Sequence, residues 1–346
     1  MDIKVAVDSL EFRKYIDKLK DKEIIYVFDK MSNEEFEELI EMDIRCMHWS
    51  LLNSVEINTS RFDIPCIKKC SLKDKIELPK RKDYKIGIIM PNCNYGNLLE
   101  KSIGSILKQT YKNWELIFVD DCSTDKSVEI AEKLLKGEPR AKIVRLRQKR
   151  LNGGTRNEAY LHLSDDVDYV YYVDSDDWLY DELSLERIVE RLVGYPDVLF
   201  VGIASYRAGV TEVCRIPEYN DRYEAMQGWS GSCGKVIKKS LALRQECLYN
   251  EGTLKEDRNQ HRRICIYMNS FSLLQKPVYV WNQENRKSVT TIREKVVWGT
   301  STIRHYADTL QLYLSVKGLD KKTDEILEAA VRKTKKEMEN GGDKQW

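Results

Sequence analysis

The stretch VYYVDSDDW at residues 170–178 joins a run of β-prone apolar residues to a cluster of carboxylates. Such a run predicts a buried strand whose C-terminal end delivers Asp174, Asp176 and Asp177 into a loop. Open α/β sheets bind their ligands beyond the C-terminal ends of the strands, where this loop is expected. Three carboxylates within four residues repel one another unless a cation lies among them. The stretch therefore predicts a site for Mg²⁺ or Mn²⁺, which take oxygen ligands and often share them with phosphates.

Two other interpretations of this cluster were weighed. An isolated DxD is more often a solvated turn with a helix cap, because so short a motif matches many sequences by chance. A calcium loop of the EF-hand type does not fit, since Leu179 takes the sixth position, where that loop needs glycine. The choice between a turn and a metal site depends on the other polar segments of the chain.

Three other polar segments are expected at the edges of the same sheet. PNCNYGN (91–97) follows a strand, VDDCSTD (119–125) ends the next strand, and NGGTRN (152–157) is a glycine turn that leads into a helix. From Lys85 the pattern alternates strand and helix, which indicates a mostly parallel sheet with helices on its faces. No GxGxxG follows the first strand, so the dinucleotide-binding fingerprint is absent.

The order of these motifs, followed by an acidic pair and a late arginine, resembles the inverting family 2 glycosyltransferases with the GT-A fold. The resemblance is to bacterial or phage enzymes of the polysaccharide type and covers about residues 85–291. It implies an α/β fold of the GT-A class, with a Rossmann-like, mixed and mostly parallel sheet flanked by helices. The ordered set of motifs is far more specific than any one of them.

By this resemblance, the first two loops hold the nucleoside of a nucleotide sugar. The backbone after the first strand supplies Pro91, Asn92 and Asn94. Asp120 or Asp121 is expected to accept a hydrogen bond from the uracil ring or the ribose. The structural alternative for Asp121 is a cap on the helix that follows it.

Arg156 and Asn157 match the RN pair of the family, which the resemblance places at a helix start near the nucleotide. A cation at a helix N-terminus suits a diphosphate. The turn is shorter than usual for the family, with two residues between Gly153 and Arg156, so the detailed contact is not carried over. Gly153 is counted with the nucleotide-binding residues, and Arg286, which matches the late arginine, is expected to bind the diphosphate.

The resemblance also assigns roles to four carboxylates. Asp174 and Asp176 form the DxD, with Asp176 expected on the metal and Asp174 on the ribose or the metal. The cation would neutralise the UDP leaving group. Displacement at the anomeric carbon needs a carboxylate that takes the acceptor's hydroxyl proton, and Asp257 is assigned that role, with Glu256 beside it. An exposed acidic pair at a helix start is the structural alternative for these last two residues.

Composition describes a soluble globular protein, and the length allows two domains or one domain with appendages. Of the 346 residues, 57 are basic and 56 acidic, and a net charge of +1 creates no global attraction to nucleic acid or anionic membranes. Nine cysteines without a CxxC indicate reduced thiols in a cytoplasmic setting. Neither a signal peptide nor a transmembrane segment is expected, because no apolar run approaches about 20 residues. Peripheral attachment at the inner face of a membrane stays open.

Three domains are predicted. Residues 1–80 read as a small N-terminal α/β accessory unit with strands IKVAV and EIIYVF and a capping box at Ser32 and Glu35. Residues 81–292 form the GT-A domain, and residues 293–346 form a C-terminal helical extension.

The leading hypothesis is an inverting, metal-dependent glycosyltransferase that moves a sugar, favoured as a UDP-sugar, to a glycan or another hydroxyl acceptor. Transfer to a modified base in DNA, as in some phage enzymes, is the alternative within the class, but the net charge does not favour it. A non-catalytic nucleotide-sugar-binding module is the alternative of another class. A nucleotidyltransferase would need a glycine-rich, basic phosphate loop where PNCNYGN stands. No feature of the sequence predicts an oligomeric state.

Overall fold

The computed structural model describes residues 83–192, 194–284 and 295–339 and four N-terminal strands. These strands are β1 (Asp2–Ala6), β2 (Ile24–Phe28), β3 (Cys46–His48) and β4 (Ile67–Lys68). Contacts between Cα atoms group residues 84–188 and 197–346 into one unit, and residues 1–83 and 189–196 into another.

The N-terminal strands form a sheet of their own in the order β3-β2-β1-β4. Neighbours pair in parallel except β1 and β4, which are antiparallel. The strands predicted at IKVAV and EIIYVF are confirmed as β1 and β2. The helical patterns, including the capping box at Ser32, lie outside the described residues, and the domain limits at 80 and 292 stay a prediction.

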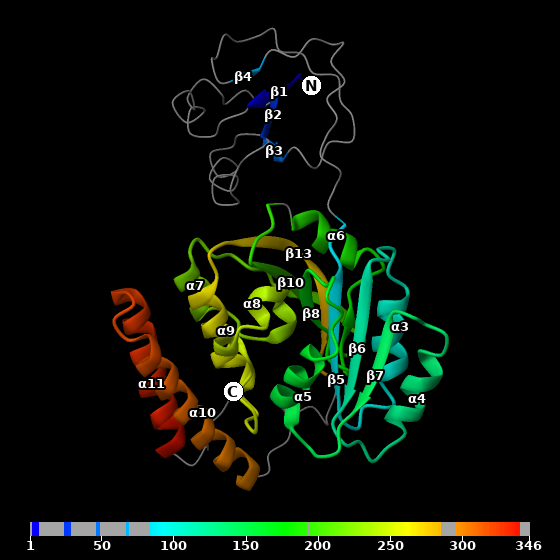
Figure 1. The fold of residues 1–346 in the computed structure, drawn as a ribbon, viewed down its shortest axis with the longest axis vertical. Helices are drawn as coiled ribbons and strands as arrows, with labels where there is room; N and C mark the ends of the chain where they lie inside the picture. Colours follow the sequence, from blue (N-terminus) through cyan, green and yellow to red (C-terminus); the bar gives the residue numbers. More distant parts are fainter. Residues whose placement is uncertain are drawn as a thin grey trace. The chain divides into compact units, whose positions relative to one another are not determined.

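The larger unit is built on a mixed sheet. Its strands are β5 (Ile86–Asn92), β6 (Trp114–Asp120), β7 (Ala141–Arg145), β8 (Tyr169–Tyr172), β9 (Trp178–Leu179), β10 (Val198–Arg207), β11 (Val210–Arg215), β12 (Lys235–Lys238) and β13 (Phe271–Asn282). In the described part of the chain these nine strands follow the order β7-β6-β5-β8-β12-β10-β13-β9, with β11 paired to β10 (Figure 1). Strands β7, β6, β5 and β8 are parallel, as the βα alternation predicted. Strand β12 runs antiparallel between β8 and β10 and joins the two halves.

The helices of this unit connect the strands and cover the sheet. They are α3 (Leu99–Leu107), α4 (Ser127–Leu134), α5 (Leu151–Tyr160), α6 (Ser184–Arg191), α7 (Arg222–Gln227), α8 (Lys239–Ala242), α9 (Glu256–Tyr267), α10 (Lys295–Val316) and α11 (Lys321–Glu339). One core cluster joins Ile117 on β6, Tyr172 on β8 and Phe200 on β10 with Ile264 on α9. Successive side chains of a strand point to opposite faces of the sheet. Tyr172 therefore points toward α9, and its neighbour Tyr171 points to the opposite face.

Two local predictions were wrong. The segment STDKSVEIAEKLL predicts a helix capped by Ser123 or Thr124, but Lys126 takes the capping position of α4 without a side-chain bond, and Asp125 accepts the backbone N–H of Ser127 at 2.9 Å. The hydroxyl of Ser123 is engaged elsewhere, by the carboxylate of Asp120. The predicted glycine turn at 152–155 is instead the first turn of α5, because the helix already begins at Leu151.

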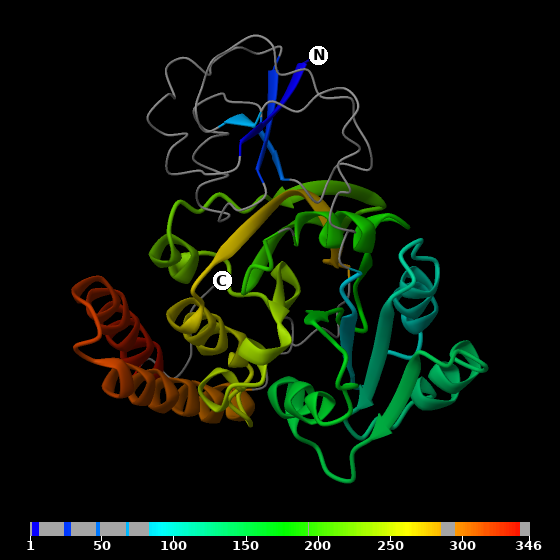
Figure 2. The same cartoon turned by 45° about the horizontal axis from the view of Figure 1, so that its top comes forward.

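The C-terminal helices α10 and α11 pack against each other and lie beside α9 in both views, where they are drawn in orange and red (Figure 1, Figure 2). Leu312 of α10 and Leu327 of α11 are buried in the same core cluster as Ile264. These helices are therefore part of the core of the larger unit. Within the described residues, no helix combines the length and the apolar character needed to cross a membrane.

Candidate active site

The loop after β8 holds its carboxylates in two different environments. Asp177 is buried, and its carboxylate accepts hydrogen bonds from the Tyr279 hydroxyl at 2.6 Å and the Asn282 backbone N–H at 2.8 Å. Burial, and then the charges of Asp176 and Asp174, raise the pKa of Asp177 well above its usual range. Asp174 and Asp176 are only half-buried. Asp177 thus ties the loop to the end of β13, and the two residues of the predicted DxD lie at the sheet edge.

Arg156 lies between carboxylates from two distant parts of the chain. Its Nη2 donates to Asp174 Oδ1 at 2.8 Å, and its Nη1 donates to Glu256 Oε1 at 2.7 Å. The side chain is 3% exposed, and the rings of Tyr172 and Tyr249 lie with their centroids 6.0 and 5.3 Å from the guanidinium carbon. The guanidinium fork can hold two carboxylates with separate nitrogens. Arg156 therefore connects the DxD loop to the acidic pair.

Burial and the charge of the partner shift the pKa values of Arg156 and Glu256 in opposite directions. Burial raises the pKa of Glu256 to about 7, although Arg156 lowers it. Burial alone would lower the pKa of Arg156, but Asp174, Tyr249 and Glu256 raise it well above its usual value. Arg156 therefore carries its charge throughout the physiological range. The sequence predicts Arg156 near a diphosphate; its hydrogen-bond partners in the structure are the carboxylates of Asp174 and Glu256, and the diphosphate contact stays a prediction.

Asp257 follows Glu256 in the first turn of α9 but has a different environment. Glu256 is 6% exposed, whereas Asp257 is half-buried and more open to solvent. Burial lowers the pKa of Lys235 to about 8, and the charge of Asp257 acts to raise it. The Lys235 amine donates to the backbone oxygens of Ser230 and Gly231, both at 2.8 Å. The carboxylate predicted to act as a base is thus the accessible member of the pair.

Asp120 holds the first two loops of the sheet edge together. Its Oδ1 accepts a hydrogen bond from Asn92 Nδ2 at 2.9 Å, and its Oδ2 accepts the backbone N–H of Ser123 at 2.9 Å. Asn94 has a φ of 62°, and its side-chain oxygen accepts the backbone N–H of Thr124 at 2.7 Å. The structure therefore brings together Asn92, Asn94 and Asp120, three of the residues predicted to hold the nucleoside. Pro91 is the last residue but one of β5, and its carbonyl accepts a hydrogen bond from the Ser175 hydroxyl at 2.8 Å.

Asp121 is buried and holds the start of α5. Its two carboxylate oxygens accept the backbone N–H groups of Arg150 at 2.7 Å and Leu151 at 2.9 Å. Leu151 has a φ of 59°, an uncommon conformation for a branched residue that these bonds stabilise. The capping alternative considered for Asp121 applies, but the helix it caps is α5 and not the helix that follows it in the chain.

Gly153 and Asn157 bring α5 close to the segment that leads into α9. A Cβ atom on Gly153 would lie 2.6 Å from the Asn250 backbone oxygen and 3.2 Å from Glu256 Cβ. The amide of Asn157 donates to the Tyr249 oxygen at 2.9 Å and accepts the Tyr249 N–H at 3.0 Å. Both residues were predicted to bind the nucleotide; the contacts observed for them are between parts of the protein. Only a residue without a side chain at position 153 permits this approach.

Asp174 and Asp176 fit a divalent cation that a bound diphosphate would share. Among the described residues no three His, Cys, Asp or Glu side chains are grouped to hold a metal by themselves. Mg²⁺ commonly binds one or two carboxylates together with substrate phosphates and waters. Burial, Asp176 and Asp174 also raise the pKa of Tyr95, which marks a concentration of negative charge at this edge. Arg286, predicted to bind the diphosphate, lies outside the described residues.

The contacts that fix the start of α9 could not be predicted from the sequence. Ser301 of α10 accepts the backbone N–H of Leu254 at 2.7 Å, and its hydroxyl lies 3.0 Å from that of Thr253. The Lys255 amine pairs with Glu337 of α11 at 2.7 Å. The charged pattern of the last helix predicted only packing at the surface and gave no signal for these partners. Helices α10 and α11 thus hold the segment that carries the acidic pair.

Replacing Ser301 with alanine should destabilise the protein, because it leaves the Leu254 N–H without its acceptor. We expect the free energy of unfolding to fall by about 1–3 kcal/mol, measured by urea denaturation. Ser315→Ala is the control on the same helix, since among the described residues the hydroxyl of the exposed Ser315 bonds only to the Leu312 oxygen one turn earlier. Equal losses in the two variants would contradict a special role for Ser301.

Comparison with known proteins gives a family match for part of this chain. A model of glycosyl transferase family 2 matches residues 87–249. The putative teichuronic acid biosynthesis glycosyltransferase TuaG of Bacillus subtilis is 35% identical over 109 residues, which are 31% of this chain and 42% of that protein. The poly(ribitol-phosphate) beta-N-acetylglucosaminyltransferase TarP of Staphylococcus aureus is 37% identical over 118 residues, 32% of each chain. The matched segment thus spans less than half the length of these curated relatives.

Solved structures show the same fold. S. aureus TarS 1–349 in complex with UDP-GlcNAc superimposes with a TM-score of 0.60 at 18% identity and covers 72% of both chains. TarS 1–349 in another crystal structure gives a TM-score of 0.51 at 21% identity, over 64% of this chain and 65% of that chain. The curled mixed sheet with its flanking helices is the GT-A fold that the motifs predicted. The family model thus identifies residues 87–249 as a family 2 glycosyltransferase domain, and the solved structures show its fold.

Proposed function

We propose that the protein transfers a sugar from a UDP-sugar to an acceptor hydroxyl, with inversion at the anomeric carbon, in the synthesis of a cell-surface glycan. One observation carries the proposal: Arg156 joins Asp174 of the DxD loop to Glu256, the neighbour of Asp257. Donor-side and acceptor-side carboxylates are thereby held on either side of one buried cation. The UDP-GlcNAc complex of TarS supports the donor class, and the name of TarP supports a surface polymer as acceptor.

The donor would lie along the C-terminal ends of β5, β6 and β8. The loops joined by Asp120 form the nucleoside platform. The side-chain oxygen of Asn92 is buried without a hydrogen-bond partner among the described residues, and an N–H or hydroxyl of the nucleoside would satisfy it. Asp174 and Asp176 would hold Mg²⁺ or Mn²⁺, which neutralises charge on the diphosphate as it leaves.

Asp257 acts as the general base. Its carboxylate takes the proton of the acceptor hydroxyl while the hydroxyl oxygen attacks the anomeric carbon. The new bond forms as the bond to the UDP oxygen breaks, and UDP leaves with the electron pair. Glu256 stays in its buried pair with Arg156 and fixes the direction of α9, so Glu256 is a positioning residue. The accessible, half-buried state of Asp257 suits a group that must meet the acceptor.

Removal of divalent cations tests the donor half of this proposal. Release of UDP from UDP-GlcNAc, with or without an acceptor, is expected to stop in EDTA and to return when Mn²⁺ or Mg²⁺ is added in excess. Asp176→Asn should require more metal for the same rate, whereas Asp166→Asn should not, since Asp166 is exposed and pairs with Lys85. A rate that EDTA leaves undiminished would remove the metal from the mechanism.

A further inference from the structure

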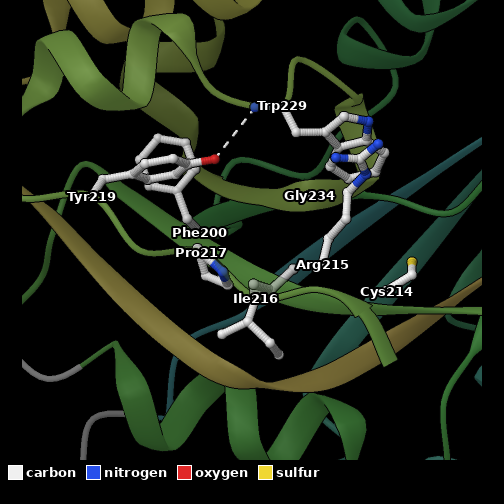
Figure 3. Close-up of a pocket in the computed structure, with 9 residues that line it drawn as sticks. Phe200, Cys214, Arg215, Ile216, Pro217, Tyr219, Trp229 and Gly234 are labelled. Carbon is white, nitrogen blue, oxygen red and sulfur yellow. Dashed lines mark hydrogen bonds between the residues drawn. The ribbon is translucent and has the colours of Figure 1, made fainter. Parts of the chain in front are cut away.

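A pocket beside Trp229 has no role in the site described above. It has a volume of about 250 Å³ and lies between β10, β11 and the turn that precedes β12 (Figure 3). Phe200, Tyr219 and Trp229 supply aromatic walls, and Arg215 lies at its side. Pockets for drug-sized ligands measure about 300–1,000 Å³, so this one suits a smaller unit such as one substituted sugar ring.

The indole of Trp229 is held in place by its own turn. A Cβ atom on Gly231 would lie 2.5 Å from the ring, and one on Gly234 would lie 2.7 Å from it. The backbone N–H of Trp229 donates to the Tyr219 hydroxyl at 3.4 Å, the dashed line in Figure 3. The glycines therefore let the ring lie against the backbone, which fixes an aromatic surface at the pocket. Rigid aromatic faces of this kind pack well against the apolar face of a sugar.

Arg215 provides a charge next to this aromatic surface. The residue is exposed on β11, and its guanidinium lies 5.2 Å from the centre of the Trp229 ring. Among the described residues its guanidinium pairs with no carboxylate within ion-pair distance. An exposed cation–π contact is weak, so a ligand can displace it. The guanidinium fork matches the oxygens of a phosphate or a carboxylate.

The pocket adjoins the proposed base through one short turn. Gly234 lines the pocket, and the next residue, Lys235, is buried and electrostatically coupled to Asp257. The Lys235 amine also binds the backbone oxygens of Ser230 and Gly231, which follow Trp229. The turn at 229–235 thus supplies Trp229 and Gly234 to the pocket and ends in Lys235, whose charge is influenced by Asp257. An acceptor whose hydroxyl reaches Asp257 can extend along this turn.

We propose that the pocket binds an anionic sugar unit of the acceptor. The sugar ring lies against Trp229, and its phosphate or carboxylate replaces the ring contact of Arg215. The assignment of this unit to the acceptor rests on the proposed glycosyl transfer, but its binding does not. Such a pocket would favour acceptors in which the sugars carry negative groups or alternate with them.

Binding is tested on the full chain with saturating UDP and Mg²⁺, so that the nucleotide site is filled. The probes are glucose 1-phosphate, glucuronate, glucose and inorganic phosphate. The binding of each probe is measured by saturation-transfer NMR and calorimetry. We expect at least one anionic sugar to bind and glucose to bind about 10- to 100-fold more weakly, as expected for loss of a charged hydrogen bond. A preference for glucose 1-phosphate identifies a phosphorylated unit, and a preference for glucuronate identifies a uronic acid.

Two variants and one control assign the binding to the pocket. Arg215→Gln should abolish the preference for the anionic sugar, and Trp229→Ala should abolish sugar binding. Trp229→Phe, which keeps a ring, should retain it. Arg207→Gln is the control, because Arg207 is exposed on the same β10–β11 hairpin and does not line the pocket. The proposal would be overturned if Arg215→Gln bound the anionic sugar with unchanged affinity, or if neither anionic sugar bound. It would also be overturned if inorganic phosphate bound as tightly as the anionic sugars.

A separate measurement keeps this proposal distinct from the proposed function. UDP release from UDP-GlcNAc in the absence of acceptor should be the same in Arg215→Gln and in the wild type. If no nucleotide sugar is cleaved but the anionic sugar still binds in an Arg215-dependent way, the proposed glycosyl transfer is wrong and the assignment of the pocket is supported. If cleavage proceeds and no anionic sugar binds, the pocket assignment fails alone.

Discussion

Replacing Asp257 with asparagine is expected to reduce sugar transfer by about 10²- to 10⁴-fold, the usual contribution of a general base. The amide keeps the size of the side chain but cannot take the acceptor proton. Donor binding should not change, because Asp257 lies in the first turn of α9 and the donor is proposed along β5, β6 and β8. The effect should therefore appear in kcat, and the affinity for UDP measured by calorimetry should stay the same.

The control for Asp257→Asn is Glu129→Gln, which removes one negative charge from an exposed position of α4. That variant should transfer sugar at the wild-type rate. Full activity of Asp257→Asn, or an equal loss of UDP affinity and kcat, would show that another group is the base.

Arg156→Gln is expected to have the largest effect on both stability and activity. It removes the cation that pairs with Asp174 and Glu256, and breaking a buried ion pair from one side costs about 3–5 kcal/mol. Loss of Arg156 also removes the group that lowers the pKa of Glu256, so that carboxyl will be protonated at neutral pH. Arg156→Lys should not restore activity, since one ammonium cannot reproduce two separate guanidinium contacts.

The double variant Arg156→Gln/Glu256→Gln separates stability from catalysis. Neutralising Glu256 removes the unpaired buried carboxyl, so part of the unfolding free energy should return while transfer stays low. Arg145→Gln is the control, because Arg145 is 56% exposed and pairs with the exposed Glu132. Urea denaturation that gives Arg156→Gln the stability of this control would contradict the bridging role.

The sequence predicted those parts of the site that depend on local patterns. Apolar runs predict β5, β6 and β8, and the carboxylates that follow the last of these runs are predicted at the sheet edge. These features depend on neighbouring residues, since a buried strand must consist of apolar side chains and its loop must start where they end. The ordered motifs also predicted the GT-A fold.

Pairings over long distances in the chain could not be predicted. Asp177 resembles Asp174 and Asp176 in sequence but is buried, because its partners Tyr279 and Asn282 lie about a hundred residues later. The bridge from Arg156 to Glu256 has the same separation. A hydrogen-bond partner that folding alone brings close leaves no periodic signal, so a single sequence shows which residues can pair but not which do.

The start of helix α5 could not be predicted from the sequence either. The glycines at 153 and 154 indicated a turn by propensity, yet they lie within α5 because Asp121 holds the preceding backbone and α9 approaches too closely for a side chain. Tertiary contacts here outweigh a helix cost of about 1 kcal/mol for each glycine. The cap of α5 is likewise supplied from a distant segment, because Asp121 lies in the loop after β6.

The stereochemistry of the first product tests the central claim most directly. The ¹H NMR spectrum of the anomeric proton is followed while the protein and Mn²⁺ cleave UDP-α-GlcNAc, with water or a sugar as the acceptor. Direct displacement assisted by Asp257 predicts that the β-anomer appears first, with a large coupling to H2, before mutarotation. First appearance of the α-anomer would contradict a single displacement at this site.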